Sequence, residues 1–242
     1  MDTRCIFTSG LLQPEHSFRF SQDALLLAGF ANALFPAKKE RIADLGCGSG
    51  AALLALASLR PLHGLGIDIS EELLACARAN ADRAGLANAR FICADLTDRR
   101  ALLPLAGSQE AVLTNPPFYT RLEGRPSKER LRDMALRGGN GELIVQFCSQ
   151  AARLLMHHGF FLCIYPANKV AQILRALCYA HLGLRALCSV HETCGAPASR
   201  ILVLARKNAE DDCVFHPPLI LHADNGAWQP EARALCPWLG RG

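Results

Sequence analysis

The chain lacks any run of roughly 18–20 apolar residues, the length that a helix needs to cross a bilayer. Residues 1–6 lack the pattern of a signal peptide, and no C-x-x-C pair is present among the 11 cysteines. An odd number of thiols, mostly in apolar stretches, is typical of buried reduced cysteines rather than of a disulfide framework or a zinc site. We therefore expect a cytoplasmic protein without a metal and without membrane contact.

An excess of charge is also missing, because 26 basic and 22 acidic residues leave a formal net charge of +4. This balance permits a nucleic-acid partner without requiring one. The 242 residues, 50% of them hydrophobic, suffice for one well-buried domain. We expect a single domain over 1–242, made of an N-terminal segment (1–40), a core (41–207) and a tail (208–242) packed on the core.

Short apolar segments alternate with helical patterns along the core. The expected strands cover residues 41–45, 63–69, 90–94, 111–114, 160–165, 184–191 and 200–206. The expected helices cover residues 23–34, 49–59, 71–84, 142–157 and 168–180, with Ser70 and Gly85 capping the third of them. Strands that alternate with helices predict an α/β fold with a mostly parallel, seven-stranded sheet covered on both faces. The proline-dotted tail is expected to be rich in loops.

A glycine-rich motif joins the first expected strand to the next helix. Residues 44–50 read D-L-G-C-G-S-G, so Gly46, Gly48 and Gly50 alternate where the strand turns into the helix. Glycine allows a tight bend and close approach of a ligand to main-chain N–H groups, and the helix N-terminus favours a carboxylate or a phosphate. Taken alone, this motif also fits NAD and flavin proteins.

Acidic residues follow the strands in the same region. Asp68 ends the second strand about twenty residues after the glycines, where a carboxylate can accept both hydroxyls of a ribose. Asp95 ends the third strand, where an adenine ring would lie. Asp44 either holds a backbone turn or faces the ammonium group of a cofactor. The expected cofactor-binding residues are Asp44, Gly46, Gly48, Gly50, Asp68, Ile69, Asp95, Leu96 and Asn115. The non-functional alternative for Asp68 and for Asp95 is a helix cap or a solvated turn residue.

The sharpest motif is Asn115-Pro116-Pro117-Phe118, which ends the fourth expected strand. Proline has a carbonyl but no N–H, so the segment is rich in acceptors and poor in donors. The side-chain oxygen of Asn115 and the carbonyl of Pro116 can each accept one hydrogen of a planar amine, turning its lone pair towards a methyl donor. Phe118 offers a face for stacking a base, worth about 1–3 kcal/mol. The catalytic candidates are therefore Asn115, Pro116 and Phe118, and the alternative is an ordinary Asn-Pro turn.

These two motifs, in this order, resemble the Rossmann-like amino-group methyltransferases that use S-adenosylmethionine. Residues 18–28 read F-R-F-S-Q-D-A-L-L-L-A and resemble the entry segment of the bacterial tRNA1(Val) adenine-N6 methyltransferase family. Residues 121–137, 160–169 and 217–226 resemble its basic loop, its fifth strand and its tail. The resemblance implies S-adenosylmethionine as cofactor, tRNA as partner, methylation of adenine N6, and a cofactor pocket covered by the entry segment through Ser21 and Asp23.

The basic loop carries six basic side chains against three acidic ones. Phosphate contact through Arg121, Arg125, Lys128 and Arg130 is one interpretation, and a solvated helix face is the other. The chain departs from the family at residues 15–17, at 135–139 and at 191–195, where several expected nucleic-acid contacts are altered. The pair His157-His158 is interpreted as part of a turn rather than as a metal site.

Three rival functions remain open. A protein-glutamine methyltransferase would use the same N-P-P-[FY] motif to bind a conjugated amide. Those enzymes usually carry a helical domain before the glycine loop. A DNA adenine methyltransferase would need a recognition domain that the sequence does not reveal. A nucleic-acid-binding protein of methyltransferase fold, without transfer activity, is the non-enzymatic alternative.

Overall fold

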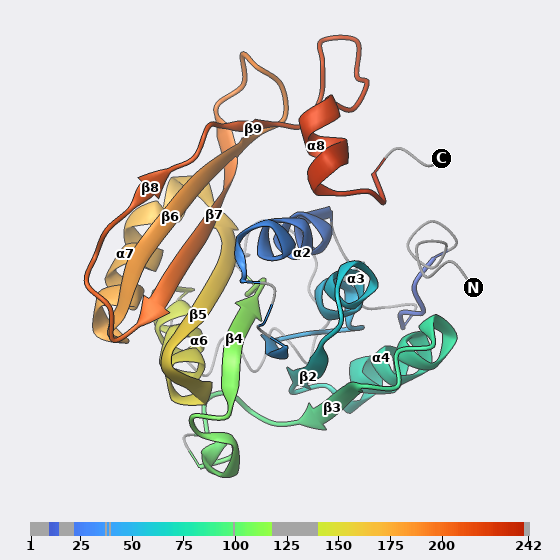
Figure 1. The fold of residues 1–242 in the computed structure, drawn as a ribbon, viewed down its shortest axis with the longest axis vertical. Coiled ribbons are helices and arrows are strands. Elements are labelled where there is room, and N and C mark those ends of the chain that lie inside the picture. The colour runs from blue at the N-terminus through green and yellow to red at the C-terminus, as the bar shows by residue number, and fades with distance from the viewer. Residues whose placement is uncertain are drawn as a thin grey trace.

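A computed structural model describes residues 10–14, 22–36, 38, 40–98, 100–117 and 140–239 (Figure 1), with side chains of the helix that starts at Asn140 described from residue 143. Within these residues nine strands form one sheet in the order β3-β2-β1-β4-β5-β7-β6-β8, with β9 also pairing with β6. The strands are β1 (Arg41–Leu45), β2 (His63–Asp68), β3 (Ala89–Cys93), β4 (Gln109–Thr114), β5 (Leu155–Pro166), β6 (Leu182–His191), β7 (Ala198–Lys207), β8 (Val214–Phe215) and β9 (Leu219–Ile220). Only β7 runs antiparallel to its neighbours, β5 and β6.

Helices cover both faces of the sheet (Figure 1). The described helices are α2 (Gln22–Leu34), α3 (Ala51–Leu59), α4 (Glu71–Ala84), α6 (Asn140–Leu154), α7 (Val170–Tyr179) and α8 (Pro230–Leu235), with short 3-10 turns at Leu103–Leu105 and Ala167–Lys169. One core contains residues of α2, α3 and α8, and the other contains residues of α6 and α7. Alternate residues of β1 enter opposite cores, Ile42 on the α2–α3 side and Ala43 and Leu45 on the α6–α7 side.

The prediction for residues 71–84 is confirmed at both ends. Ser70 caps α4 by accepting a hydrogen bond from Leu73 N at 3.3 Å. Gly85 ends the helix with φ 67°, in the left-handed region that favours glycine. Six of the seven predicted strands lie within two residues of their expected bounds, whereas β5 begins at Leu155, five residues before its expected start. The mostly parallel sheet with helices on both faces is confirmed.

The predicted helix over residues 142–157 is too long, because α6 ends at Leu154 and β5 begins at the next residue. The pairing of β4 with β5 shifts register between Gln109 and Ala111, opposite the extra residues of β5. His158 lies in this irregular stretch with φ 59°. The two histidines therefore belong to a bulged strand and not to a simple turn.

The tail is more ordered than the sequence predicted. It adds β8 and β9 to the exposed edge of β6, so the sheet has nine strands in the described residues and not seven. An unpaired strand edge leaves backbone groups without partners, and these short strands supply them. The tail also forms α8 beside α2 (Figure 1), where the backbone of Leu235 lies so close to Gly29 that a larger residue at Gly29 would collide with it.

Candidate active site

The glycine motif forms a tight loop between β1 and α3. Gly46, Gly48 and Gly50 have φ values of 70°, 55° and 87°, all in the region that favours glycine. The N–H groups of Gly46 and Cys47 both donate to Ile67 O, at 2.8 and 3.1 Å, which joins the loop to β2. A Cβ added to Gly48 would meet nothing within 4 Å, so the space above this residue is open to a ligand. The predicted bend is confirmed.

Asp68 lies at the end of β2 and is 3% exposed. Its Oδ2 accepts a hydrogen bond from Gly48 N at 2.8 Å, and its Oδ1 accepts one from Ser70 N at 2.9 Å. The carboxylate therefore braces the glycine loop against the start of α4. Each oxygen has a second lone pair left for a ligand hydroxyl. The adjacent Ile69 is 48% exposed, an unusual position for a large apolar side chain beside a buried aspartate.

Asp44 lies one residue before the end of β1 and is 2% exposed. Burial, together with the nearby charge of Asp68, raises the pKa of its carboxyl group to about 8, and a hydrogen bond with the backbone of Leu53 opposes part of this rise. The group is thus mostly protonated at neutral pH in the absence of a cation. A ligand ammonium group at this position would favour the ionised form.

Asp95 and Leu96 follow β3. Asp95 Oδ1 accepts hydrogen bonds from the backbone N–H and the hydroxyl of Thr97, at 2.8 and 2.7 Å, which makes a local turn. Leu96 is 9% exposed, and its carbonyl accepts a hydrogen bond from Gln150 Nε2 at 2.8 Å. These contacts fix the loop after β3 against α6.

The end of β4 positions Asn115. Thr114 Oγ1 donates to Leu45 O at 2.9 Å, which ties the end of β4 to the glycine loop. Asn115 Oδ1 is buried and has no hydrogen-bond partner among the described residues. Pro116, which is also buried, lacks an N–H and cannot supply one. A buried oxygen without a donor is costly, so the site is complementary to a ligand that brings an N–H group.

Comparisons with known proteins indicate the fold and the cofactor. Residues 42–126 match the family model described as a methyltransferase domain. The chain is 26% identical to a crystal structure of a predicted O-methyltransferase from Agrobacterium tumefaciens, over 89% of this chain and 96% of that one, with a TM-score of 0.72. The cofactor is S-adenosylmethionine. The sheet and its helices therefore form a Rossmann-like methyltransferase fold.

Two curated relatives match shorter stretches. The 23S rRNA (uracil(1939)-C(5))-methyltransferase RlmD of Stenotrophomonas maltophilia is 40% identical over 99 residues, which is 40% of this chain and 22% of the relative. The release factor glutamine methyltransferase of Bradyrhizobium diazoefficiens is 37% identical over 109 residues, which is 43% of this chain and 35% of the relative. The matched stretches thus span about a fifth to a third of the length of these relatives.

Asn80 is a site residue that sequence reasoning missed. It is fully buried in α4, its Oδ1 accepts a hydrogen bond from Leu12 N at 2.8 Å, and its Nδ2 donates to Leu12 O at 3.0 Å and Ser49 O at 3.1 Å. Asn80 therefore ties residues 10–14, here called the N-terminal strap, to the glycine loop between β1 and α3. Its one sequence signal is an asparagine on the apolar face of an amphipathic helix.

Asp23 lies at the start of α2 and is 7% exposed. Its Oδ2 forms an ion pair with Arg200 Nε at 3.1 Å. Arg200 is opposite Pro166 in the β5–β7 pairing, so the pair lies at the edge of the sheet where β5 ends. The structure thus places Asp23 against β7, a contact between residues 177 positions apart that no local pattern predicts.

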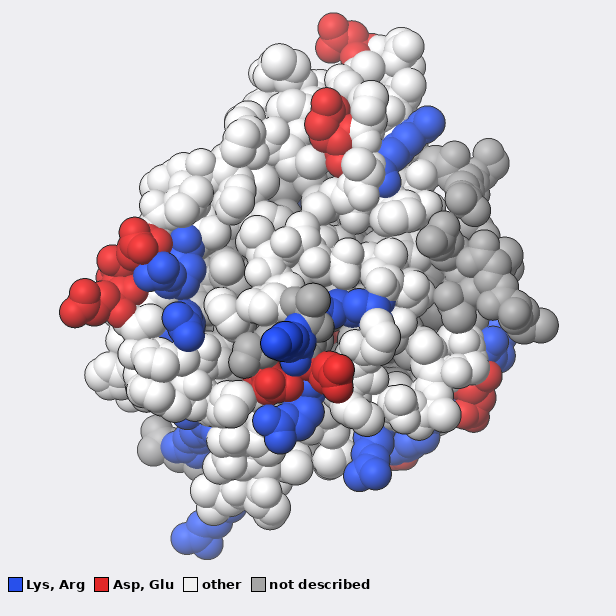
Figure 2. Space-filling model, in the orientation of Figure 1, with Lys and Arg blue, Asp and Glu red and all other residues white. Residues whose placement is uncertain are grey.

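The remaining predicted site residues lie outside the described part of the chain. These are Ser21, Phe118, Arg121, Arg125, Lys128 and Arg130. On the described surface, basic and acidic side chains lie side by side at several places (Figure 2). The described residues contain no group of three or more side chains that could hold a metal, and no described helix is long and apolar enough to cross a membrane.

Proposed function

We propose that this chain transfers the methyl group of S-adenosylmethionine to N6 of an adenine in tRNA. The observation that carries the proposal is the buried Asn115 Oδ1, which has no donor among the described residues and is followed by Pro116. An exocyclic amine brings two N–H groups, which suit this oxygen and the Pro116 carbonyl. The resemblance of residues 18–28 and 217–226 to the tRNA adenine-N6 family supports adenine in tRNA as the acceptor.

The residues of the cofactor site have distinct roles in this proposal. Gly48 leaves space for close approach, Asp68 offers lone pairs to the ribose hydroxyls, and ionised Asp44 pairs with the ammonium group. When bound, S-adenosylmethionine supplies an electrophilic methyl group on a sulfonium. Exposed Ile69 gives the adenine ring of the cofactor an apolar surface, and Asp95 follows the neighbouring strand β3.

The acceptor amine is a poor nucleophile, because its lone pair is conjugated with the ring. Asn115 Oδ1 and the Pro116 carbonyl each accept a hydrogen bond from one amine N–H, which turns the lone pair out of the ring plane. With S-adenosylmethionine bound, the nitrogen held in this way would take the methyl group from sulfur and lose its extra proton to water. No general base is required, so the residues act by positioning and by accepting hydrogen bonds.

A second candidate is methylation of a glutamine side-chain amide in a protein. Glutamine methyltransferases are among the relatives that this chain resembles, with 37% identity over 109 residues in one case. A primary amide also has two N–H groups on a planar nitrogen, so Asn115 suits it equally. Both candidates use the same hydrogen bonds to Asn115 and Pro116, and they differ only in the molecule that carries the amine.

The test incubates the protein with tritiated S-adenosylmethionine and, in separate reactions, tRNA, rRNA and a protein extract that contains release factors. The proposal predicts label in tRNA, and loss of that label with Asn115→Ala at an unchanged dissociation constant for S-adenosylmethionine. Label in the protein fraction alone would establish the glutamine candidate. Failure to bind S-adenosylmethionine by calorimetry would overturn both and favour a binding protein of the same fold.

A further inference from the structure

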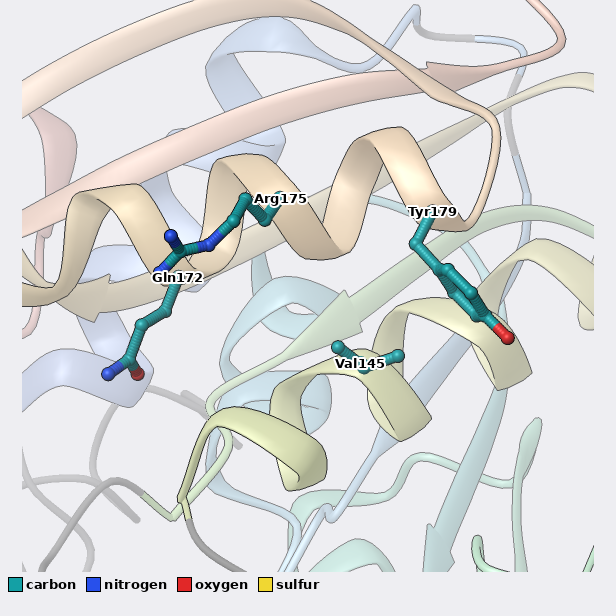
Figure 3. A pocket seen from close by; sticks show the side chains of 4 residues that line it. All are labelled: Val145, Gln172, Arg175 and Tyr179. Atoms are coloured by element: carbon teal, nitrogen blue, oxygen red, sulfur yellow. The ribbon is translucent and has the colours of Figure 1, made fainter.

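A hollow outside the cofactor site lies between α6 and α7. Its volume is about 270 Å³, and it is lined by Val145, Gln172, Arg175 and Tyr179. Figure 3 shows three of these side chains on α7 and Val145 on α6, with Tyr179 at one end of the hollow and Arg175 directed towards Gln172 at the other. A volume near the small end of ligand pockets suits one planar group rather than a protein helix.

The chemistry of this hollow is that of a site for single-stranded nucleic acid. Tyr179 is 66% exposed, although a tyrosine ring is normally at least half covered by its neighbours. Arg175 is exposed and has no ion-pair partner among the described residues. The sequence of α7 contains no acidic residue, so nothing on this helix repels a phosphate. An aromatic face beside a cation is the combination that holds a base and its phosphate.

The hollow is connected to the acceptor site through β5. Thr114 pairs with Cys163, so Tyr165 lies two residues further along, at the same edge of the sheet as Asn115. The Tyr165 hydroxyl donates to Gln172 Oε1 at 3.2 Å, which joins that edge to the hollow. From Gln172 to Tyr179 the helix rises about 10 Å, roughly the length of three stacked nucleotides.

We infer that the α6–α7 hollow binds the RNA strand that flanks the methylated adenine, with a base stacked on Tyr179 and a phosphate on Arg175. This inference rests on the proposed function, because it assumes an RNA acceptor. It places the flanking strand across α7, away from the glycine loop. Substitutions in the hollow therefore affect RNA and leave cofactor binding unchanged.

The test measures tRNA binding, tRNA methylation and S-adenosylmethionine affinity for Tyr179→Ala, Tyr179→Phe and Arg175→Gln. Tyr179→Ala is expected to weaken tRNA binding about tenfold, and Tyr179→Phe to retain most of it, because the ring face does the stacking. Arg175→Gln is expected to lower the slope of log affinity against log salt by about 0.7. All three should keep the wild-type affinity for S-adenosylmethionine.

Matched controls come from other surfaces. Phe215→Ala removes an aromatic ring that is 77% exposed on β8, and Arg90→Gln removes an exposed charge on β3, at the other end of the sheet. Both are expected to bind tRNA like the wild type. If the α7 variants also match the wild type while tRNA is methylated, the inference is wrong and the proposed function stands. If the wild type labels only protein and the α7 variants reduce that label, the hollow holds a polypeptide and both proposals fail.

Discussion

Replacing Asn80 by alanine is expected to loosen the N-terminal strap and the glycine loop together. The substitution removes three hydrogen bonds, two to Leu12 and one to Ser49 O. At about 1 kcal/mol net for each bond, the free energy of unfolding should fall by about 3 kcal/mol. For a chain of this length that loss lowers the melting temperature by roughly 6–12 °C.

The same substitution should weaken cofactor binding, because Ser49 belongs to the glycine loop, against which the proposed function places the cofactor. We expect the dissociation constant for S-adenosylmethionine, measured by calorimetry well below the melting temperature, to rise about tenfold, which corresponds to about 1.4 kcal/mol. Asn88→Ala is the matched control, because Asn88 is exposed in the turn between α4 and β3. A melting temperature within 2 °C of the wild type, with unchanged cofactor affinity, would refute the role assigned to Asn80.

Three further predictions concern the active site. Asn115→Ala should reduce kcat for methyl transfer at least a hundredfold while binding S-adenosylmethionine normally, and a normal kcat would contradict the grip on the amine. Gly48→Ala should lower the free energy of unfolding by about 1 kcal/mol, because the φ of this residue is 55°. It should nevertheless abolish most cofactor binding, because the alanine methyl group enters the open space above the loop. A cofactor affinity equal to that of the wild type would place the ligand elsewhere. The pKa of Asp44 is about 4 in the unfolded chain and about 8 in the folded one, so between these pH values the folded state holds a proton that the unfolded state has lost. The free energy of unfolding should therefore fall with rising pH across this window, by at most about 1.4 kcal/mol per pH unit. In chemical denaturation at several pH values, Asp44→Asn should flatten this dependence, and a pH dependence parallel to that of the wild type would refute the raised pKa.

The elements around the candidate cofactor site could be predicted because their signals are local. The strand, glycine turn and helix over residues 41–59 lie within twenty residues, and the caps Ser70 and Gly85 adjoin the helix that they end. The position of Asp68 at the end of β2 followed from the same spacing. Its hydrogen bonds to the loop did not, because they depend on how β1 and β2 pair in three dimensions.

Contacts between distant segments could not be predicted. Asn80 meets Leu12 across 68 positions, and Asp23 meets Arg200 across 177. The short strands β8 and β9 contain two residues each, too few for alternation to appear in the sequence. They form because β6 offers an unpaired edge, which is a property of the assembled sheet.

The identity of the acceptor atom can be measured directly. The experiment labels tRNA with tritiated S-adenosylmethionine in the presence of the protein, digests the product to nucleosides and separates them by chromatography with mass spectrometry. The proposed function predicts that the label coelutes with N6-methyladenosine and is absent when Asn115→Ala replaces the wild type. Label in another nucleoside, or in N5-methylglutamine from the protein fraction, would contradict it.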